Sequence, residues 1–262
     1  MRITLVTITY QAMATLPATL DSVLKQSHDD VEHLIIDGAS SDDTLRIAES
    51  YRQASQEADN GHEVIVVSEP DDGLYDAMNK GLRRATGEYV CFLNAGDRLP
   101  DTDTLARIVE TANQAGDGHL PGVLYGDTDI VDGEGRFLCH RHLSPPDRLS
   151  WRSFRKGMLV CHQAFYARVE IAREVAFDTR YRYSADVDWC IRVMKKAEKR
   201  HMPLTRVPGV IALYLSEGQT TQHHRESLRE RYHVMLRHYG RLTTSTMHMW
   251  FLARAAIRKL RH

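Results

Sequence analysis

Four groups of polar residues each directly follow a stretch with the composition of a β-strand. They are Thr9 with Tyr10, Asp37 with Gly38, the acidic turn at 69–73, and residues 94–97. Carboxylate and amide groups in such positions can hold a phosphorylated ligand, and an acid beside a glycine can coordinate a divalent cation that bridges two phosphates. The chain has neither a GxGxxG nor a GxxxxGK[ST] motif, which disfavours a dehydrogenase or a P-loop enzyme.

Two of these groups have competing interpretations. Turn and capping chemistry explains residues 38–43 but leaves Asp37 unexplained, because a carboxylate that closes an apolar strand could accept a hydrogen bond from a nucleotide base. Asp97 ends the polar group at 94–97, and an ordinary Asx turn is the alternative to a metal ligand there. The pattern alone leaves both alternatives open.

The elements that position these groups follow from hydrophobic spacing. Apolar, β-branched runs predict strands, and segments with a 3.6-residue period predict helices. The strands are 3–9, 31–37, 63–68 and 89–94, and the helices are 16–26, 42–55, 74–85 and 104–114. This alternation predicts an α/β fold whose mostly parallel sheet has helices on both faces. In such sheets ligands bind beyond the carboxyl ends of the strands, where all four polar groups fall.

The second half of the chain has a different pattern. Residues 122–140 read as strands around a glycine-rich turn, residues 157–168 as another strand, and residues 204–215 as a strand kinked at Pro208. Helices are predicted at 185–199, 225–239 and 246–261.

Composition limits the classes of protein that the chain can represent. With 262 residues and 42% apolar content it can bury a large core, and no apolar run approaches the roughly 18 residues of a membrane-spanning helix. The four cysteines form no CxxC pair, which fits reduced thiols in a cytosolic compartment. The net charge of −1 combines a basic tail at 223–262, with nine Lys or Arg against two Glu, and an acidic remainder.

Six motifs occur in an order and spacing that resembles a known family. They are TLVTITYQA, DGASSDDT, SEPDDGLYDAMNKG, FLNAGD, CHQAFY and SADVDW. Together they resemble the inverting family 2 glycosyltransferases of bacterial polysaccharide assembly, which have the GT-A fold, and most closely the WcaE-like enzymes of colanic acid and exopolysaccharide biosynthesis. The resemblance covers residues 1–224.

The resemblance implies roles for the residues at the strand ends. Thr7, Thr9 and Tyr10 would form a floor for the nucleotide, and Asp37 would bind the base. The acidic motif after the fourth strand would hold the ribose and a Mn²⁺ or Mg²⁺ ion on the diphosphate; here it consists of Asn94, Ala95, Gly96 and Asp97. Because only Asp97 is charged, phosphate oxygens, water or distant ligands must complete the coordination of the metal.

The motif at 68–81 would form the wall beside the nucleotide and the diphosphate. Lys80 would contact phosphate, and Asp72 or Asp76 would contact the ribose or the sugar. The candidate donor-binding residues of this wall are Glu69, Asp72, Asp76, Asn79 and Lys80.

Proton chemistry would come from a later acid. In the family the catalytic base aligns with Asp186, which the sequence places at the start of a helix, and Asp188 is the second choice. His162 and Gln163, predicted in a strand, would lie near the acceptor and the diphosphate; a buried core histidine is the alternative for His162. Residues 217–220 replace the family's donor-closing loop, and His223 could reach the metal.

We therefore expect a GT-A domain at 1–222, divided into a nucleotide-sugar-binding half at 1–115 and an acceptor and catalytic half at 116–222, followed by a basic helical extension at 223–262. In the last predicted helix Met249, Ala253, Ala256 and Leu260 share one face and Arg254, Arg258 and Arg261 another. Such a helix suits an anionic membrane surface, but it could also dock on its own domain or on a second subunit of a homodimer.

The sequence thus predicts a metal-dependent inverting glycosyltransferase at the cytoplasmic face of the membrane. It would move a sugar from a nucleotide-diphosphate sugar to a glycan or lipid-linked acceptor, with no nucleic-acid partner. Two other functions remain open. A sugar nucleotidyltransferase would need a glycine-rich basic loop after the first strand, which TYQAMATLP lacks. A non-catalytic glycan- or partner-binding module would fit the sparsely charged 94–97 motif.

Overall fold

The parallel half of the sheet places the predicted ligand-binding loops at one edge. The computed structural model describes residues 1–115, 119–216 and 224–259. Strand β1 (Ile3–Thr9) lies between β2 (Val31–Asp37) and β4 (Tyr89–Phe92), and β3 (Glu63–Ser68) pairs with the outer side of β2. All three pairings are parallel, so the carboxyl ends of these four strands meet, as the sequence predicted.

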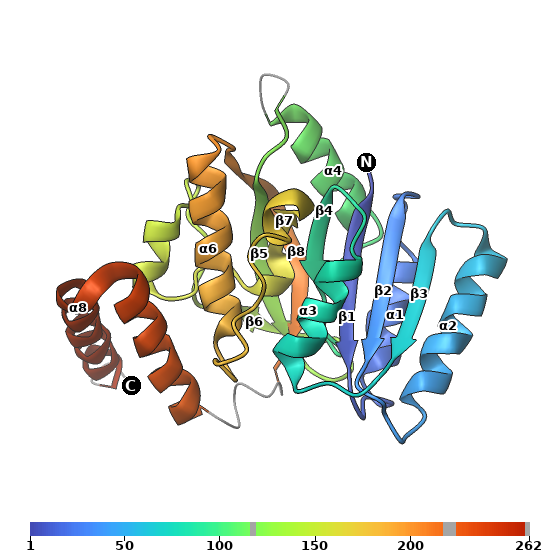
Figure 1. The fold of residues 1–262 in the computed structure, drawn as a ribbon, viewed down its shortest axis with the longest axis horizontal. Helices are drawn as coiled ribbons and strands as arrows, with labels where there is room; N and C mark the ends of the chain where they lie inside the picture. The colour runs from blue at the N-terminus through green and yellow to red at the C-terminus, as the bar shows by residue number, and fades with distance from the viewer. Residues whose placement is uncertain (116–118, 217–223, 260–262) are drawn as a thin grey trace.

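The second half of the sheet is mixed. Strand β7 (Phe165–Arg168) is antiparallel to both β4 and β5 (Val123–Val131), β6 (Phe137–His140) is antiparallel to β5, and β8 (Leu204–Leu215) is parallel to β5. The strand order is β3-β2-β1-β4-β7-β5-β6, with β8 paired to β5 outside this path. Strand β7 runs opposite to both of its neighbours, β4 and β5. As a result β5 and β8 run in the same direction as β1, and their carboxyl ends reach the same edge (Figure 1).

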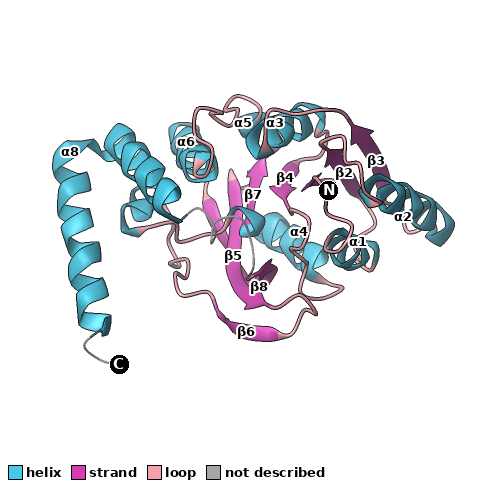
Figure 2. Cartoon of the chain, turned by 90° about the horizontal axis from the view of Figure 1, so that it is seen from below, coloured by secondary structure: helices cyan, strands magenta, loops and turns pink. Residues whose placement is uncertain are grey.

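Helices cover both faces of the sheet, which confirms the predicted layers (Figures 1 and 2). On one face α1 (Leu16–Leu24) and α2 (Thr44–Ala58) share a small apolar core with β2, and α4 (Thr104–Gln114) lies behind the sheet in Figure 1. On the other face lie α3 (Leu74–Arg84), the short α5 (Val169–Ala172) and α6 (Ala185–Lys199). A Cβ at Gly81 would come within 2.3 Å of the Val6 side chain, so this glycine lets α3 approach the sheet.

The predicted strand at 157–168 is wrong in its first part. Only Phe165–Arg168 forms a strand, and His162–Ala164 forms a 3₁₀ turn in which the Ala164 amide donates to the Cys161 carbonyl at 3.0 Å. Another 3₁₀ helix, Trp151–Lys156, precedes it. Neighbouring side chains of a strand point to opposite faces, whereas those of a tight turn can reach the same site. This difference matters for His162 and Gln163.

The C-terminal helix α8 (His224–Lys259) contains two helical segments that meet at Gly240, whose φ of 78° and ψ of 169° interrupt the helix. Two helices were predicted, but the second begins directly after Gly240 and not at Thr246. The segments pack against each other, with the Tyr232 and His248 rings 4.8 Å apart, and the Tyr239 ring stacks on Trp151. Within the described part of the chain, no helix is long and apolar enough to cross a membrane.

Candidate active site

Asp186 lies where the two halves of the fold meet. Its carboxylate, whose side chain is 15% exposed, accepts hydrogen bonds at Oδ1 from the Tyr75 hydroxyl at 3.1 Å and from the Val187 amide at 2.9 Å. His162 Nδ1 lies 3.3 Å from Oδ2. Burial would raise the pKa of Asp186, but His162 and the Arg231 guanidinium together lower it below its ordinary value. Asp186 is therefore ionised at neutral pH, as a proton acceptor must be.

The His162–Ala164 turn connects Asp186 to the polar group after β4. His162 Nε2 lies 3.2 Å from Asn94 Nδ2, and Gln163 Nε2 donates to Asp97 Oδ2 at 2.8 Å. When the Asn94 amide donates to Nε2 of a neutral ring, the proton of that ring sits on Nδ1 and is donated to Asp186. Two adjacent side chains thus hold Asn94, Asp97 and Asp186 in one hydrogen-bonded group.

Asp97 is a buried carboxylate that lies close to two buried amide groups. Its side chain is buried, Oδ1 accepts from the Leu215 amide at 3.2 Å, and burial raises its pKa to about 6 even though Gln163, His162 and backbone amides lower it. Asn94 Oδ1 and Gln163 Oε1 are also buried, and neither has a hydrogen-bond partner in the part of the chain that the structure describes. Buried oxygens without partners are uncommon and require an explanation, such as a bound ion.

These three residues fit a hard divalent cation, because Mg²⁺ and Mn²⁺ prefer carboxylate and amide oxygens. Among the described residues no three His, Cys, Asp or Glu side chains cluster in a way that could hold a metal. A cation would therefore need the amide oxygens and oxygens of a bound ligand as well as Asp97.

The carboxyl ends of β1 and β2, where the sequence predicts the nucleotide, contain Thr9, Tyr10 and Asp37. Asp37 is fully buried and accepts hydrogen bonds from the Ser40 amide at 3.0 Å and the Ser68 hydroxyl at 2.6 Å, so it fixes the loop after β2. Thr9 Oγ1 is buried without a partner among the described residues, and the Tyr10 side chain is 64% exposed. Tyr10 therefore offers an accessible aromatic face at this edge, whereas Asp37 shapes the backbone around it.

Two predicted donor contacts are placed elsewhere by the structure. The Thr7 side chain is fully buried inside the sheet, where its hydroxyl donates to the Leu93 carbonyl and lies 2.9 Å from His33 Nε2. Asn79 Nδ2 donates to the Phe177 carbonyl at 3.0 Å, and Asn79 Oδ1 accepts from the Phe177 amide at 2.7 Å. Their polar groups hold the fold together and are not free to contact a nucleotide, so these two predictions are wrong.

The remaining residues of the wall form an ion-pair cluster at the start of α3. Lys80 Nζ donates to the Pro70 carbonyl and lies 3.5 Å from Glu69 and 3.6 Å from Asp76. The exposed Asp72 donates its amide to Asp76 Oδ2 at 3.3 Å. A phosphate would have to compete with these carboxylates for Lys80.

Residues 95 and 96 contribute backbone to the site. The Ala95 amide donates to the Ile8 carbonyl, and Gly96 has a φ of 104°. A Cβ at Gly96 would lie 2.7 Å from the Leu215 side chain, so glycine is required for the turn that presents Asp97.

Asp188 points away from this group. It is fully buried, its Oδ2 accepts from Arg192 Nε at 2.6 Å, and its Oδ1 lies 2.7 Å from His238 Nε2 and 3.5 Å from Arg237. Asp188 therefore ties α6 to α8, and the structure does not place it in the predicted vicinity of the acceptor.

Sequence reasoning missed several residues around the site. Asp71 lies against Gly38, because a Cβ added at Gly38 would be 2.6 Å from Asp71 Oδ2. The sequence shows two adjacent acids at 71 and 72 but does not show which of them faces the end of β2. Tyr75 and Arg231 both act on Asp186. No signal in the tail indicated Arg231. The predicted donor loop 217–220 and His223 lie outside the described residues.

Comparisons with known proteins identify relatives of this chain. The family model "Glycosyl transferase family 2" matches residues 4–176. A PGL/p-HBAD biosynthesis glycosyltransferase of Mycobacterium bovis (strain BCG / Pasteur 1173P2) is 37% identical over 187 residues, which cover 70% of this chain and 66% of that relative. The amylovoran biosynthesis glycosyltransferase AmsB of Erwinia amylovora is 29% identical over 71% of this chain and 62% of its own length. The matches thus span slightly less than two thirds of both relatives.

Solved structures show the same fold at low sequence identity. S. aureus TarS 1-349 in complex with UDP-GlcNAc has a TM-score of 0.69 and 17% identity, over 90% of this chain and 67% of that one. The mannosyltransferase PcManGT of Pyrobaculum calidifontis, in complex with GDP-Man and Mn²⁺, has a TM-score of 0.59 and 20% identity over 97% and 75%. With two thirds of its residues matched by the family model, the chain belongs to glycosyl transferase family 2.

Proposed function

We propose that the protein is an inverting glycosyltransferase that moves a sugar from a nucleotide-diphosphate sugar to a glycan or lipid-linked acceptor. The observation that carries this proposal is the hydrogen-bonded group that holds Asp186 beside Asn94 and Asp97, at the edge where the nucleotide loops meet. The names of the relatives, which concern PGL/p-HBAD and amylovoran biosynthesis, support a role in surface glycolipid or polysaccharide assembly.

Inversion requires one displacement. The acceptor hydroxyl oxygen bonds to the anomeric carbon while the bond from that carbon to the diphosphate oxygen breaks on the opposite face. Asp186 takes the hydroxyl proton. Its Oδ2 suits this role because its hydrogen bond to His162, the one it makes with the described residues, is long, whereas Oδ1 already accepts two hydrogen bonds. Tyr75 and His162 hold the carboxylate in position.

A divalent cation is part of this proposal. Asp97, Asn94 Oδ1 and Gln163 Oε1 would hold Mn²⁺ or Mg²⁺, which would neutralise charge on the leaving diphosphate. The neighbour PcManGT, whose structure is in complex with GDP-Man and Mn²⁺, supports this assignment.

We place the enzyme at the cytoplasmic face of the membrane, with α8 against anionic lipid. Leu242, Met249 and Trp250 on its second segment are 82%, 71% and 43% exposed, and the tail is basic in sequence. A WcaE-like role in exopolysaccharide assembly, and a homodimer formed through α8, stay predictions.

A thermal-shift panel of UDP-, GDP- and dTDP-sugars with Mn²⁺ tests the proposal, followed by product analysis with the stabilising donor. One donor should raise Tm, and its sugar should be transferred with inverted anomeric configuration. Release of pyrophosphate from a nucleoside triphosphate would instead identify a nucleotidyltransferase. Sugar binding without turnover of any donor would identify a non-catalytic module.

A further inference from the structure

A cavity of about 440 Å³ lies between α3 and the segment that follows α5, on the face of the sheet that α3, α5 and α6 cover (Figure 2). Its lining residues are Asn79, Leu82, Arg83, Arg173 and Ala176. Leu82 lies about two turns after Tyr75 on α3, which is roughly 11 Å along the helix. The cavity is therefore near the end of α3 that is opposite Asp186, and it is separate from the candidate active site.

Two guanidinium groups line this cavity without a carboxylate partner among the described residues. Arg83 is exposed, and its side chain forms no hydrogen bond or ion pair with another described residue. Arg173 is also exposed, and its Nη2 donates to the Ala85 carbonyl at the end of α3. Because a guanidinium has five N–H donors, both side chains keep donors for a ligand.

The charges next to the cavity leave a positive surplus. Glu174 accepts from both Lys196 and Arg200, so one carboxylate lies between two cations. Arg192 Nη2 donates to a backbone carbonyl of the cavity wall at 2.7 Å, and Asp188 balances its charge. A negatively charged ligand would therefore meet more positive than negative charge at this cavity.

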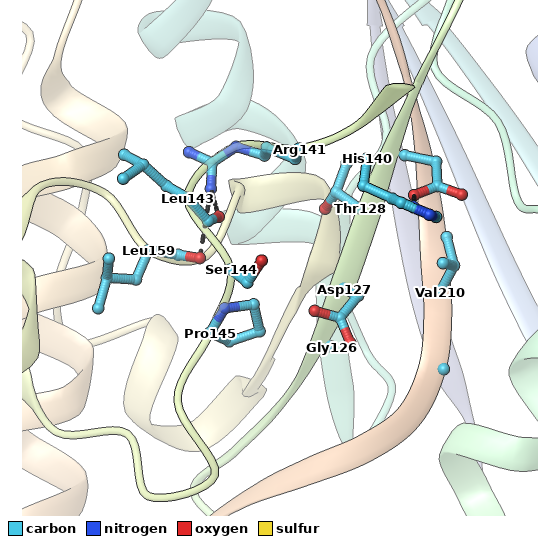
Figure 3. Close-up of a pocket in the computed structure, with 12 residues that line it drawn as sticks. Gly126, Asp127, Thr128, His140, Arg141, Leu143, Ser144, Pro145, Leu159 and Val210 are labelled. Atoms are coloured by element: carbon cyan, nitrogen blue, oxygen red, sulfur yellow. Dashed lines mark hydrogen bonds and ion pairs between the residues drawn. The ribbon is translucent and has the colours of Figure 1, made fainter. Parts of the chain in front are cut away.

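The cavity of about 340 Å³ between β5, β8 and the segment after β6 has a different balance of charge (Figure 3). Its carboxylates are paired, because Asp129 Oδ1 lies 2.7 Å from His140 Nδ1 and Asp127 Oδ2 accepts from Arg206 at 2.7 Å. Arg141 donates to three backbone carbonyls there. The charges of that cavity select no class of ligand, whereas those of the cavity beside α3 favour an anion.

A phosphate group suits two guanidinium groups better than a carboxylate does. A guanidinium presents two parallel N–H donors to a pair of oxygens. A phosphate monoester has three terminal oxygens and a charge of about −1.5 to −2 at pH 7, so it can engage both side chains. A carboxylate has two oxygens and one charge, and it would satisfy only one of them. Leu82 and Ala176 give the cavity an apolar wall for the carbon part of an ester.

The surroundings of the cavity favour a soluble ligand over a phospholipid headgroup. In the part of the chain that the structure describes, the exposed large apolar side chains lie in the loop after β1, on β6 and on α8, and not on α3 or at 169–176. A protein surface that lies against a membrane places such side chains next to its positive charges.

We propose that this cavity binds the phosphate group of a small soluble phosphate ester, held by Arg83 and Arg173. The inference goes beyond the proposed function and does not depend on it. A bound phosphate would join α3 to the segment after α5, since the two arginines come from these two elements.

NMR titration of the arginine Nε–H resonances tests the site. The probes are glycerol 3-phosphate, acetate as a carboxylate and glycerol as the uncharged counterpart, at constant ionic strength and with EDTA to keep cations out of the proposed site at Asp97. Two resonances, identified by their absence from Arg83→Gln and Arg173→Gln, should shift saturably with glycerol 3-phosphate. Acetate should bind at least tenfold more weakly, and glycerol should shift neither resonance.

Each of these two variants should bind glycerol 3-phosphate at least tenfold more weakly than the wild type, measured on the resonance that remains. Arg84→Gln is the matched control, because Arg84 is the next residue on α3 and lies 3.7 Å from Glu69 without lining the cavity. Its affinity should stay within about twofold of the wild type, since salt screens a charge that does not touch the ligand.

Three results would overturn the site: no saturable shift in the wild type, equal affinity for acetate, or a loss in Arg84→Gln as large as in Arg83→Gln. Sedimentation with phosphatidylglycerol vesicles, with phosphatidylcholine vesicles as the neutral control, examines the source of the phosphate. Vesicle binding should be the same for the wild type and both cavity variants. Binding that Arg83→Gln and Arg173→Gln both abolish would assign the cavity to a lipid headgroup and contradict a soluble ligand.

Discussion

The Tyr75 hydroxyl lies 3.1 Å from Asp186 Oδ1, across 111 residues of sequence. Tyr75 is the second residue of α3 and Asp186 the second residue of α6, so the amino-terminal ends of two helices converge on one carboxylate. The positive ends of both helix dipoles lie at this carboxylate and, in the proposed function, would also stabilise a leaving diphosphate nearby. Under that proposal residues 68–81 would contribute to the proton-accepting side of the site as well as to the donor side.

Asp186→Asn should abolish sugar transfer while leaving the donor bound. Asparagine keeps the shape of the side chain but cannot take the acceptor proton, so kcat should fall by about 10²–10⁴-fold. Titration calorimetry with the donor should give a Kd within about threefold of the wild type, a difference below the 1.4 kcal/mol of a tenfold change. A variant with near-normal turnover would refute the assignment of the base.

Tyr75→Phe should slow transfer without weakening the donor. It removes one hydrogen bond to an ionised carboxylate, a contact worth about 1.5–3 kcal/mol, so kcat should fall roughly 10- to 100-fold. Because Tyr75 positions Asp186 and does not itself react, KM for the donor should stay unchanged. A rise in KM at constant kcat would show instead that the Tyr75 hydroxyl binds the donor.

Asp97→Ala should remove the metal-dependent part of nucleotide-diphosphate binding. The change deletes the one carboxylate of the proposed cation site and leaves two amide oxygens. Calorimetry with the nucleoside diphosphate should show at least tenfold tighter binding with Mn²⁺ than with EDTA for the wild type, about 1.4 kcal/mol, and no such difference for the variant. Binding to the wild type that is insensitive to EDTA would contradict the cation site.

Glu230→Ala should impair transfer even though Glu230 lies in the tail. Its carboxylate accepts from the backbone amides of Arg182 and Tyr183 at 2.8 and 2.7 Å, just ahead of the helix that carries Asp186. Without it the approach to α6 loses two charge-assisted hydrogen bonds, each of which contributes roughly 1.5–3 kcal/mol to the stability of this segment. Because only part of that loss changes the position of Asp186, kcat should fall about tenfold, which corresponds to about 1.4 kcal/mol. The exposed Glu226 on the same helix gives the control, Glu226→Ala, which should keep full activity.

Much of the fold and part of the site were predictable. Parallel strands must end at one edge, so strand periodicity alone brings Asp37 and the 94–97 motif together. Helical spacing predicted that Asp186 and Asp188 point in different directions, since residues two apart lie about 200° apart around a helix. The motifs supplied the roles, and periodicity supplied the positions.

The remaining features depend on tertiary contacts that no local pattern encodes. Strand β1 is buried on both faces, so nothing in its sequence shows that the Thr7 hydroxyl turns toward His33 and not toward a ligand. The His162–Ala164 turn follows a run with strand composition, and its deviation from a strand is what directs two adjacent side chains to one site. Two partners of Asp188, Arg237 and His238, come from α8, some fifty residues later.

Asp188→Asn should destabilise the fold without changing the chemistry, and the loss should depend on pH. Burial would raise the pKa of Asp188, but His238 and Arg192 lower it on balance. Because the folded-state pKa lies below the unfolded one, the ionised carboxylate stabilises the fold above about pH 4, the ordinary value for Asp, and this contribution is lost as pH falls through the lower folded-state value.

Weakening a buried ion pair costs about 3 kcal/mol, or roughly 6–12 °C in Tm for a chain of this size. Thermal melts from pH 3 to pH 8 should show that full difference at pH 7 and a smaller one at pH 3, while kcat of the folded variant stays near that of the wild type. A Tm difference that is constant across this range would mean that the Asp188 charge does not contribute to joining α6 to α8.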